Sequence, residues 1–383
     1  MFHKSKLSKT FESLKIAELS DIHLGHANTP TAHVIACLHD IFPDNLLTQE
    51  LDIIILAGDV FDRQLQLAED VVFEIHQWMC SFLGMCKKYD ITLIVLEGTP
   101  SHDWKQSEWF NQINLEYNIG ADVYYAKTLD VVYFEKFGID ILFIPDEWSG
   151  SCDDTKQQVI KLLKQKNLSQ VDFTVMHGVF PHQMPKHIHN RIDMHDPDYY
   201  SKITKRLVFV GHVHLTSQWQ NILSAGSTTR LSHGEEGPKG HFRITSKEDS
   251  NQIDFIVNKR AMKYLTVDAT DKSAQDVKDL LKTTIALLKN QVGAIRVLCR
   301  SNDPAIEIVA AIKENTPLIS WTVTKPKKET KLTLLSSGGV KEVQKLVLNK
   351  NTLNDMLLAR IESKHPEWLD RCRRLLEVEI SES

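Results

Sequence analysis

Short apolar runs that end in glycine, aspartate or histidine recur along this chain, and they restrict its fold more than any other feature. The clearest run is Ile-Ile-Ile-Leu at 53–56, which is followed by Gly58 and Asp59. An uninterrupted β-branched run is typical of a strand buried on both faces of a parallel sheet. Gly58 permits a tight turn there, so Asp59 is expected at the carboxyl end of the strand, where α/β sheets bind ligands. A lone aspartate in that place often only caps the next helix.

Several other apolar runs end in the same way, which argues against a simple cap. They are followed by Asp21 and His23, by His102 and Asp103, by His177, and by His212 and His214. Segments with helical apolar spacing, such as 68–88, alternate with the runs, so the pattern predicts an α/β fold. Alternate residues of an extended segment point the same way, so the D-x-H and H-x-H pairs are each suited to hold one metal ion. Imidazole with carboxylate favours manganese, iron or zinc over calcium.

Composition sets the broad class of the protein. The 383 residues are 42% hydrophobic, enough for a full core and about two domains. We find no apolar stretch that would span a bilayer and no signal-peptide core, so we expect a cytoplasmic protein without a membrane partner. The six cysteines contain no CxxC pair, which argues against a zinc knuckle or a disulfide framework. A net charge of −5 means that DNA contacts would need local basic patches or a metal site.

The pattern of expected strands and helices changes at about residue 259. Strand and helix patterns alternate as βαβαβ through 264–323, which predicts a small α+β unit. A basic stretch and a Ser-Ser-Gly-Gly joint at 336–339 then precede two amphipathic helical segments. We therefore predict an N-terminal extension at 1–13, a main domain at 14–258, the α+β unit at 259–327, and a linker with C-terminal helices at 328–383.

Five motifs in this order resemble the calcineurin-like metallophosphoesterases. They are Asp-Ile-His at 21–23, Gly-Asp-Val-Phe-Asp at 58–62, the segment 98–103, His-Gly at 177–178 and Gly-His-Val-His at 211–214. The opening SDIHLGH, the GDVFDR box and the tail at 225–240 are most similar to SbcD-type nuclease subunits of double-strand-break repair complexes, including phage versions. The resemblance implies a β-sandwich flanked by helices, then an α+β capping domain that binds DNA. It also implies C-terminal helices that bind an SbcC-type coiled-coil ATPase.

The resemblance also implies roles for individual residues. One metal ion would be held by Asp21, His23 and His214, and the second by His177 and His212, with Asp59 bridging the two. The ions would be manganese, with magnesium or iron as alternatives, and would activate a water for attack on phosphorus. His102 would protonate the leaving oxygen or stabilise the transition state, and Asp103 would orient its imidazole.

One motif departs from the family pattern. The family's Gly-Asn-His-Asp is here Gly-Thr-Pro-Ser-His-Asp, two residues longer, and we predict Ser101 in the place of the asparagine ligand. A serine hydroxyl is shorter than an amide and a poorer neutral donor. It could bind the ion through a water, or the longer loop could bring its oxygen in directly; otherwise the second ion would be held more weakly.

These patterns lead to one main hypothesis and two alternatives. The main one is a metal-dependent DNA exonuclease and endonuclease, acting on double-stranded ends and single strands as a homodimer with its ATPase. Its role would be in DNA repair, recombination or replication, in the host cytoplasm if the protein is phage-encoded. The alternatives are a small-substrate phosphodiesterase or phosphomonoesterase, and a catalytically impaired scaffold, which only Ser101 favours.

Substrate contacts are the least specific part of the pattern. We name Arg63, Trp104, Lys186 and Arg191 as candidates. Each has a plainer alternative: a salt bridge to Asp62 or a helix acid for Arg63, a core or rim aromatic for Trp104, and surface solubility for the other two. The histidines of the segment 182–195, at 182, 187, 189 and 195, could contact a phosphate backbone, but we predict a solvated loop.

Overall fold

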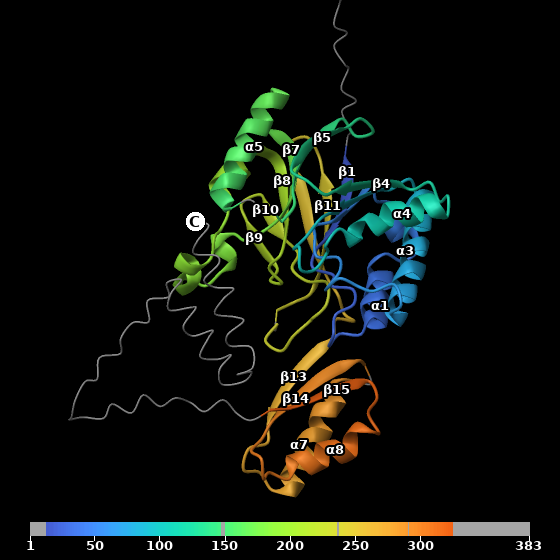
Figure 1. Cartoon of the computed structure of the whole chain (residues 1–383), viewed down its shortest axis with the longest axis vertical. Helices are drawn as coiled ribbons and strands as arrows, with labels where there is room; N and C mark the ends of the chain where they lie inside the picture. Colours follow the sequence, from blue (N-terminus) through green and yellow to red (C-terminus); the bar gives the residue numbers. More distant parts are fainter. Residues whose placement is uncertain (1–12, 147–149, 236, 290, 325–383) are drawn as a thin grey trace, which may run out of the picture. The chain divides into compact units, whose positions relative to one another are not determined.

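The computed structural model describes residues 13–146, 150–235, 237–289 and 291–324. It confirms the predicted α/β class. Two six-stranded sheets pack face to face with helices on their outer faces, and a separate three-stranded sheet follows in the sequence (Figure 1). The predicted joint and terminal helices at 328–383 lie outside the described residues. Among the residues described, none of the helices is both long and apolar enough to cross a bilayer.

The first sheet has the order β12-β11-β1-β2-β3-β4. Its parallel strands are β1 (Leu14–Leu19), β2 (Ile53–Leu56), β3 (Thr92–Leu96) and β4 (Asp122–Ala126). The antiparallel strands β11 (Gly240–Ser246) and β12 (Asn251–Val257) extend it beyond β1. Parallel strands share one carboxyl edge, so the loops after β1, β2 and β3 emerge side by side.

The second sheet has the order β5-β6-β7-β8-β10-β9. Its strands are β5 (Asp130–Phe134), β6 (Ile139–Ile144), β7 (Val171–His177), β8 (Thr204–Gly211), β9 (Ser217–Trp219) and β10 (Ile222–Ser224). β6, β7, β8 and β10 are parallel, while β5 and β9 pair antiparallel at the two edges. The carboxyl ends of β7 and β8 carry the last two histidine motifs.

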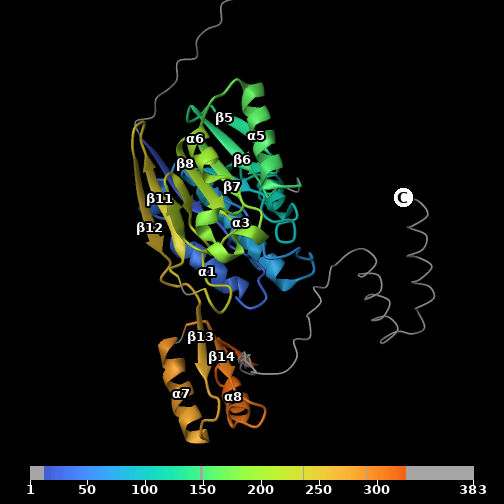
Figure 2. The same ribbon diagram turned by 90° about the vertical axis from the view of Figure 1, so that its left-hand side faces the viewer.

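Central strands such as β2 and β3 are buried on both faces, as their apolar runs predicted. Ile53 and Ile55 point between the sheets, whereas Ile54 and Leu56 point toward the helices. The first sheet is covered by α1 (Thr31–Ile41), α3 (Asp70–Lys88) and α4 (Trp109–Glu116), and the second by α5 (Cys152–Lys166) and α6 (Pro197–Ile203) (Figures 1 and 2). Burying one such aliphatic side chain contributes about 1.5–3 kcal/mol to the free energy of unfolding. The strands whose two faces are both buried therefore hold the loops at their ends in place.

The third sheet consists of the parallel strands β13 (Lys263–Asp268), β14 (Gly293–Leu298) and β15 (Ile319–Thr324). They are connected by α7 (Ala274–Leu287) and α8 (Ala305–Lys313), in the predicted order (Figure 2). Ile295 and Val297 of the central strand pack with Leu281 of α7 and Val309 of α8. This sheet therefore has a hydrophobic core of its own.

Candidate metal centre

Loops from five strand ends bring the predicted site residues together. The loops after β1, β2 and β3 belong to the first sheet, and those after β7 and β8 to the second. Two groups of ligand atoms result, each within 4.8 Å: Asp21, His23 and His214, and Asp59, His177 and His212. A third such group, His23, Asp62 and His102, overlaps the first.

The backbone at this edge is tightly packed and partly strained. A Cβ on Gly58, which has φ +89°, would lie 2.3 Å from His177 Nδ1, and one on Gly98 would lie 2.1 Å from the Asp59 nitrogen. Four of the candidate ligands have positive φ angles: 51° at Asp21, 54° at His23, 50° at Asp59 and 106° at His212. Non-glycine residues adopt this region at an energetic cost, and such strain gathers at functional sites.

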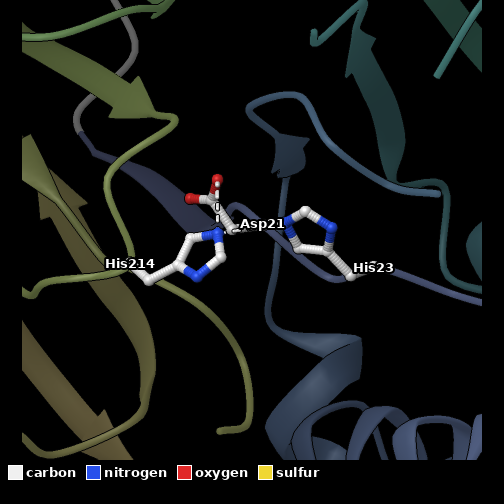
Figure 3. A group of neighbouring side chains, drawn as sticks. All are labelled: Asp21, His23 and His214. Atoms are coloured by element: carbon white, nitrogen blue, oxygen red, sulfur yellow. Dashed lines mark hydrogen bonds and ion pairs between the residues drawn. The ribbon is translucent and has the colours of Figure 1, made fainter. Parts of the chain in front are cut away.

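The first ligand group is arranged around two facing imidazoles (Figure 3). His23 Nε2 lies 3.1 Å from His214 Nε2. Each Nδ1 faces a carboxylate, Asp62 Oδ1 at 3.2 Å from His23 and Glu235 Oε1 at 3.4 Å from His214. A carboxylate oxygen can only accept, so the hydrogen belongs on Nδ1 and the Nε2 lone pairs point at each other. Facing lone pairs at this distance fit a cation, and the outer carboxylates hold the rings in the ligating tautomer.

Two buried aspartates link the groups. The Asp21 carboxylate is fully buried and accepts from the His212 backbone nitrogen at 2.9 Å. Asp59 Oδ2 lies 3.3 Å from His177 Nε2 and 3.9 Å from His23 Nε2, between the two groups. Burial alone would raise the pKa of Asp59, but His177, His23 and the Thr99 amide lower it well below its usual value. Buried carboxylates that stay charged need a cation close by, so the donor set fits divalent metal.

The second ligand group corrects the prediction for the third motif. The hydroxyl of Thr99 lies 3.2 Å from Asp59 Oδ2, 3.3 Å from His177 Nε2 and 3.4 Å from His212 Nδ1. Ser101, which we predicted for this place, is exposed in the turn beyond it. Thr99 comes three residues after the end of β3, so the two extra residues of the motif lengthen the loop beyond Thr99.

The structure also changes the role predicted for Asp103. Its buried carboxylate accepts from the backbone nitrogens of Phe61 at 2.9 Å and Gly98 at 2.8 Å, so it ties two loops together. Burial and the nearby Asp59 raise the pKa of Asp103 well above its usual value. The His102 imidazole is oriented instead by the Asp62 carbonyl, which accepts from Nδ1. Its ring centroid lies 4.9 Å from that of His23, beside the first ligand group.

Comparison with known proteins agrees with this geometry. The sequence profile of the calcineurin-like phosphoesterase family matches residues 14–215, more than half of the chain. The chain belongs to the calcineurin-like phosphoesterase family. Its members hydrolyse phosphate esters and bind divalent metals, which matches the two ligand groups.

No curated protein matches this chain. One matching solved structure is TT1561 of Thermus thermophilus, at 11% identity and a TM-score of 0.36, with 63% of this chain and 98% of that chain covered. Another has 10% identity and a TM-score of 0.39, covering 63% of this chain and 99% of its own.

The candidate substrate contacts of the phosphoesterase lie outside the ligand groups. Arg63 forms a two-pronged ion pair with Glu69, which is the plainer alternative for it. Trp104 is 56% exposed, which excludes a core position. Lys186 and Arg191 are both exposed on the 3₁₀ turn η3 (Lys186–Arg191).

The predicted solvated loop at 182–195 is wrong for two of its histidines. His182 stacks on Trp219 with ring centroids 5.9 Å apart and on Phe180 at 5.7 Å. His195 is 7% exposed and packs against Tyr200. Burial lowers the pKa of His195 to about 4, so its imidazole is neutral at pH 7 and behaves as an aromatic core residue.

Four residues that our site prediction omitted support the phosphoesterase centre: Asp62, Thr99, Glu235 and Lys239. Asp62 is the second acid of the G-D-x-x-D motif and could have been found there. Thr99 would have been found by counting from the strand end. Glu235 and Lys239 lie far along the chain, and only the fold brings them to His214; the predicted tail residue Glu236 lies outside the described residues.

Proposed function

We propose that this protein is a metal-dependent DNA nuclease that hydrolyses phosphodiester bonds. The observation that carries the proposal is the pair of buried ligand groups that share Asp59, with His102 beside them. Family membership supports phosphoester hydrolysis. The SDIHLGH and GDVFDR motifs support DNA as the substrate, through their similarity to SbcD-type nucleases.

The described residues would divide the metal binding between them. Asp21, His23 and His214 would hold one ion, His177 and His212 the second, and Asp59 would contact both. Manganese is the proposed metal, with magnesium or iron as alternatives. Two divalent ions in such sites polarise the phosphate and activate a water for in-line attack.

His102 is placed to handle the proton of the reaction. Its Nδ1 donates to the Asp62 carbonyl, so a proton that moves in catalysis has to be carried on Nε2. A positioned imidazole of this kind contributes about 10²–10⁴-fold to the rate. Asp62 thus positions two histidines, through its carbonyl for His102 and through its carboxylate for His23.

Trp104 is the best candidate contact for a nucleic-acid base. It follows Asp103 directly, has φ 36° and exposes its indole, which is an unusual conformation for an aromatic residue. The next residue holds this turn, because the Lys105 nitrogen donates to the buried Glu97 carboxylate at 2.6 Å. An exposed indole in the same loop as His102 is suited to stack on a base. Arg63, Lys186 and Arg191 would contact phosphates.

The partners belong to the same proposal. Similarity to SbcD-type nucleases supports a cytoplasmic homodimer that works with an SbcC-type ATPase in DNA repair, recombination or replication, in a phage or a cell. The βαβαβ unit supports the capping domain of that comparison. Of the alternatives, a small-substrate phosphodiesterase would use the same centre. The impaired scaffold rested on a hydroxyl at Ser101 in place of an asparagine ligand, and the same question now applies to the Thr99 hydroxyl, which lies at the second ligand group.

End-labelled double-stranded DNA, incubated with manganese, magnesium or a chelator, tests the proposal. We expect manganese-dependent degradation that Asp59→Ala and His102→Ser abolish or reduce at least about 10²-fold. Asp44→Ala and His39→Ser, at exposed positions, are matched controls that should keep full activity. Intact DNA with rapid hydrolysis of an aryl phosphate ester would favour the small-substrate enzyme. No activity on either substrate, with the ATPase present, would reject both enzymes.

A further inference from the structure

We propose that the Thr99 hydroxyl is the neutral oxygen ligand of the second metal site, in place of the asparagine of the family pattern. The inference rests on the two-metal centre of the proposed function and adds a ligand to it. Without Thr99, the second site has only imidazoles and the shared carboxylate. A neutral oxygen is therefore the missing donor, and it has to come from the loop after β3.

The distances around the hydroxyl are those of neighbouring ligands. Thr99 Oγ1 lies 3.2–3.4 Å from Asp59 Oδ2, His177 Nε2 and His212 Nδ1. Two ligands that each lie about 2.1 Å from one ion are roughly 3.0–3.5 Å apart in octahedral or tetrahedral geometry. Three separations in this range, to the three members of the second group, place the hydroxyl in the ligand shell rather than behind it.

The loop fixes the hydroxyl before any ion binds. The Thr99 backbone nitrogen donates to Asp59 Oδ1 at 2.6 Å, so the residue is tied to the bridging carboxylate. Pro100 follows and restricts the Thr99 backbone to extended conformations. Threonine is also stiff about χ1, because two heavy atoms branch at Cβ. The hydroxyl is therefore preorganised, which reduces the entropy lost on binding an ion.

A hydroxyl ligand should make the second site weaker than the first. An alcohol oxygen carries less partial negative charge than an amide oxygen, so it gains less from a divalent ion. The first site keeps its three ligands and the shared Asp59 carboxylate. We therefore expect the two sites to fill at different metal concentrations, which would make activity depend on manganese supply.

Manganese titration of the full chain, without DNA, tests this directly. Free Mn²⁺ is followed by its electron paramagnetic resonance signal, and two ions should bind per chain with unequal affinity. Thr99→Val keeps the shape but removes the oxygen, and should weaken the second ion at least about 10-fold while the first is unchanged. Thr99→Ser should stay close to the parent, and Thr99→Asn should bind the second ion more tightly.

Ser101→Ala is the matched control, because Ser101 is exposed in the same loop. It should bind both ions as the parent does. Thermal unfolding in chelator shows that each variant is folded. Equal binding of two ions by the parent and Thr99→Val would overturn the ligand assignment, as would a parent that binds only one ion. Two unequal sites that Thr99→Val alters, in a protein that leaves DNA intact, would keep the assignment and reject the nuclease.

Discussion

Lys239→Met should destabilise the protein far more than the loss of an ordinary lysine. The side chain of Lys239 is 2% exposed, and its Nζ lies 2.7 Å from each of Glu235 Oε2, the His214 carbonyl and Ser227 Oγ. Burial alone would raise the pKa of Glu235, but His214 and Lys239 lower it well below its usual value. Methionine fills similar space without charge, so the buried Glu235 carboxylate would lose its lysine partner and keep only His214.

Removing one partner of a buried pair costs about 3–5 kcal/mol, which we expect here as a loss in the free energy of unfolding. Urea unfolding in chelator measures it without a contribution from metal binding. Lys88→Met is the control, because the Lys88–Asp44 pair is exposed and such pairs are worth about 0–1 kcal/mol. Replacing Glu235 by glutamine as well should recover part of the loss. If Lys239→Met costs no more than Lys88→Met, the buried pair does not stabilise the fold.

Three further predictions concern pH and substrate. Burial lowers the folded-state pKa of His241 to about 3. As pH falls below 6.5, the free energy of unfolding should therefore fall by about 1.4 kcal/mol per pH unit, because only the unfolded chain binds the proton. His241→Leu should flatten this slope, measured by urea unfolding at several pH values. Burial and the nearby Asp21 raise the pKa of Glu18, whose carboxylate has no hydrogen-bond partner within the described part of the chain. The folded state therefore favours the protonated side chain, and the free energy of unfolding should fall as pH rises above 4.5. Glu18→Leu should therefore raise the melting temperature at pH 7, and an unchanged or lower value contradicts this. Trp104→Ala should raise the KM for DNA several-fold with little change in kcat; an unchanged KM excludes stacking.

The sequence predicts the sheet well because its strands are buried on both faces. Continuous apolar runs such as Ile53–Leu56 are visible without any knowledge of their partners. The residues after each run then fall at the carboxyl edges of two sheets. The face-to-face packing of these sheets brings Asp59 of the first together with His177 of the second, from positions far apart in the sequence. Strand direction predicts each edge, but the meeting of the two edges depends on how the sheets pack.

Loop length is where sequence reasoning failed. A motif with two extra residues can be aligned from its strand end or from its histidine, and we counted back from His102 to Ser101. The backbone leaves β3 in a fixed direction, so the residue close to the strand end, Thr99, reaches the cluster. The His182 and His195 predictions failed for a different reason. Their local sequence is polar, but aromatic side chains from elsewhere pack on both rings.

The least predictable feature is the group that accepts a hydrogen bond from Nδ1 in three of the four metal-binding imidazoles. His23 uses the Asp62 carboxylate, His177 the Ala57 carbonyl at 2.9 Å, and His214 the distant Glu235 carboxylate. A backbone carbonyl has no sequence signature, and only folding brings Glu235 to its histidine. All three partners nevertheless do the same thing, because an oxygen that only accepts fixes the hydrogen on Nδ1 and leaves Nε2 to bind metal. The ligands can thus be read from motifs, whereas their protonation is decided by the tertiary structure around them.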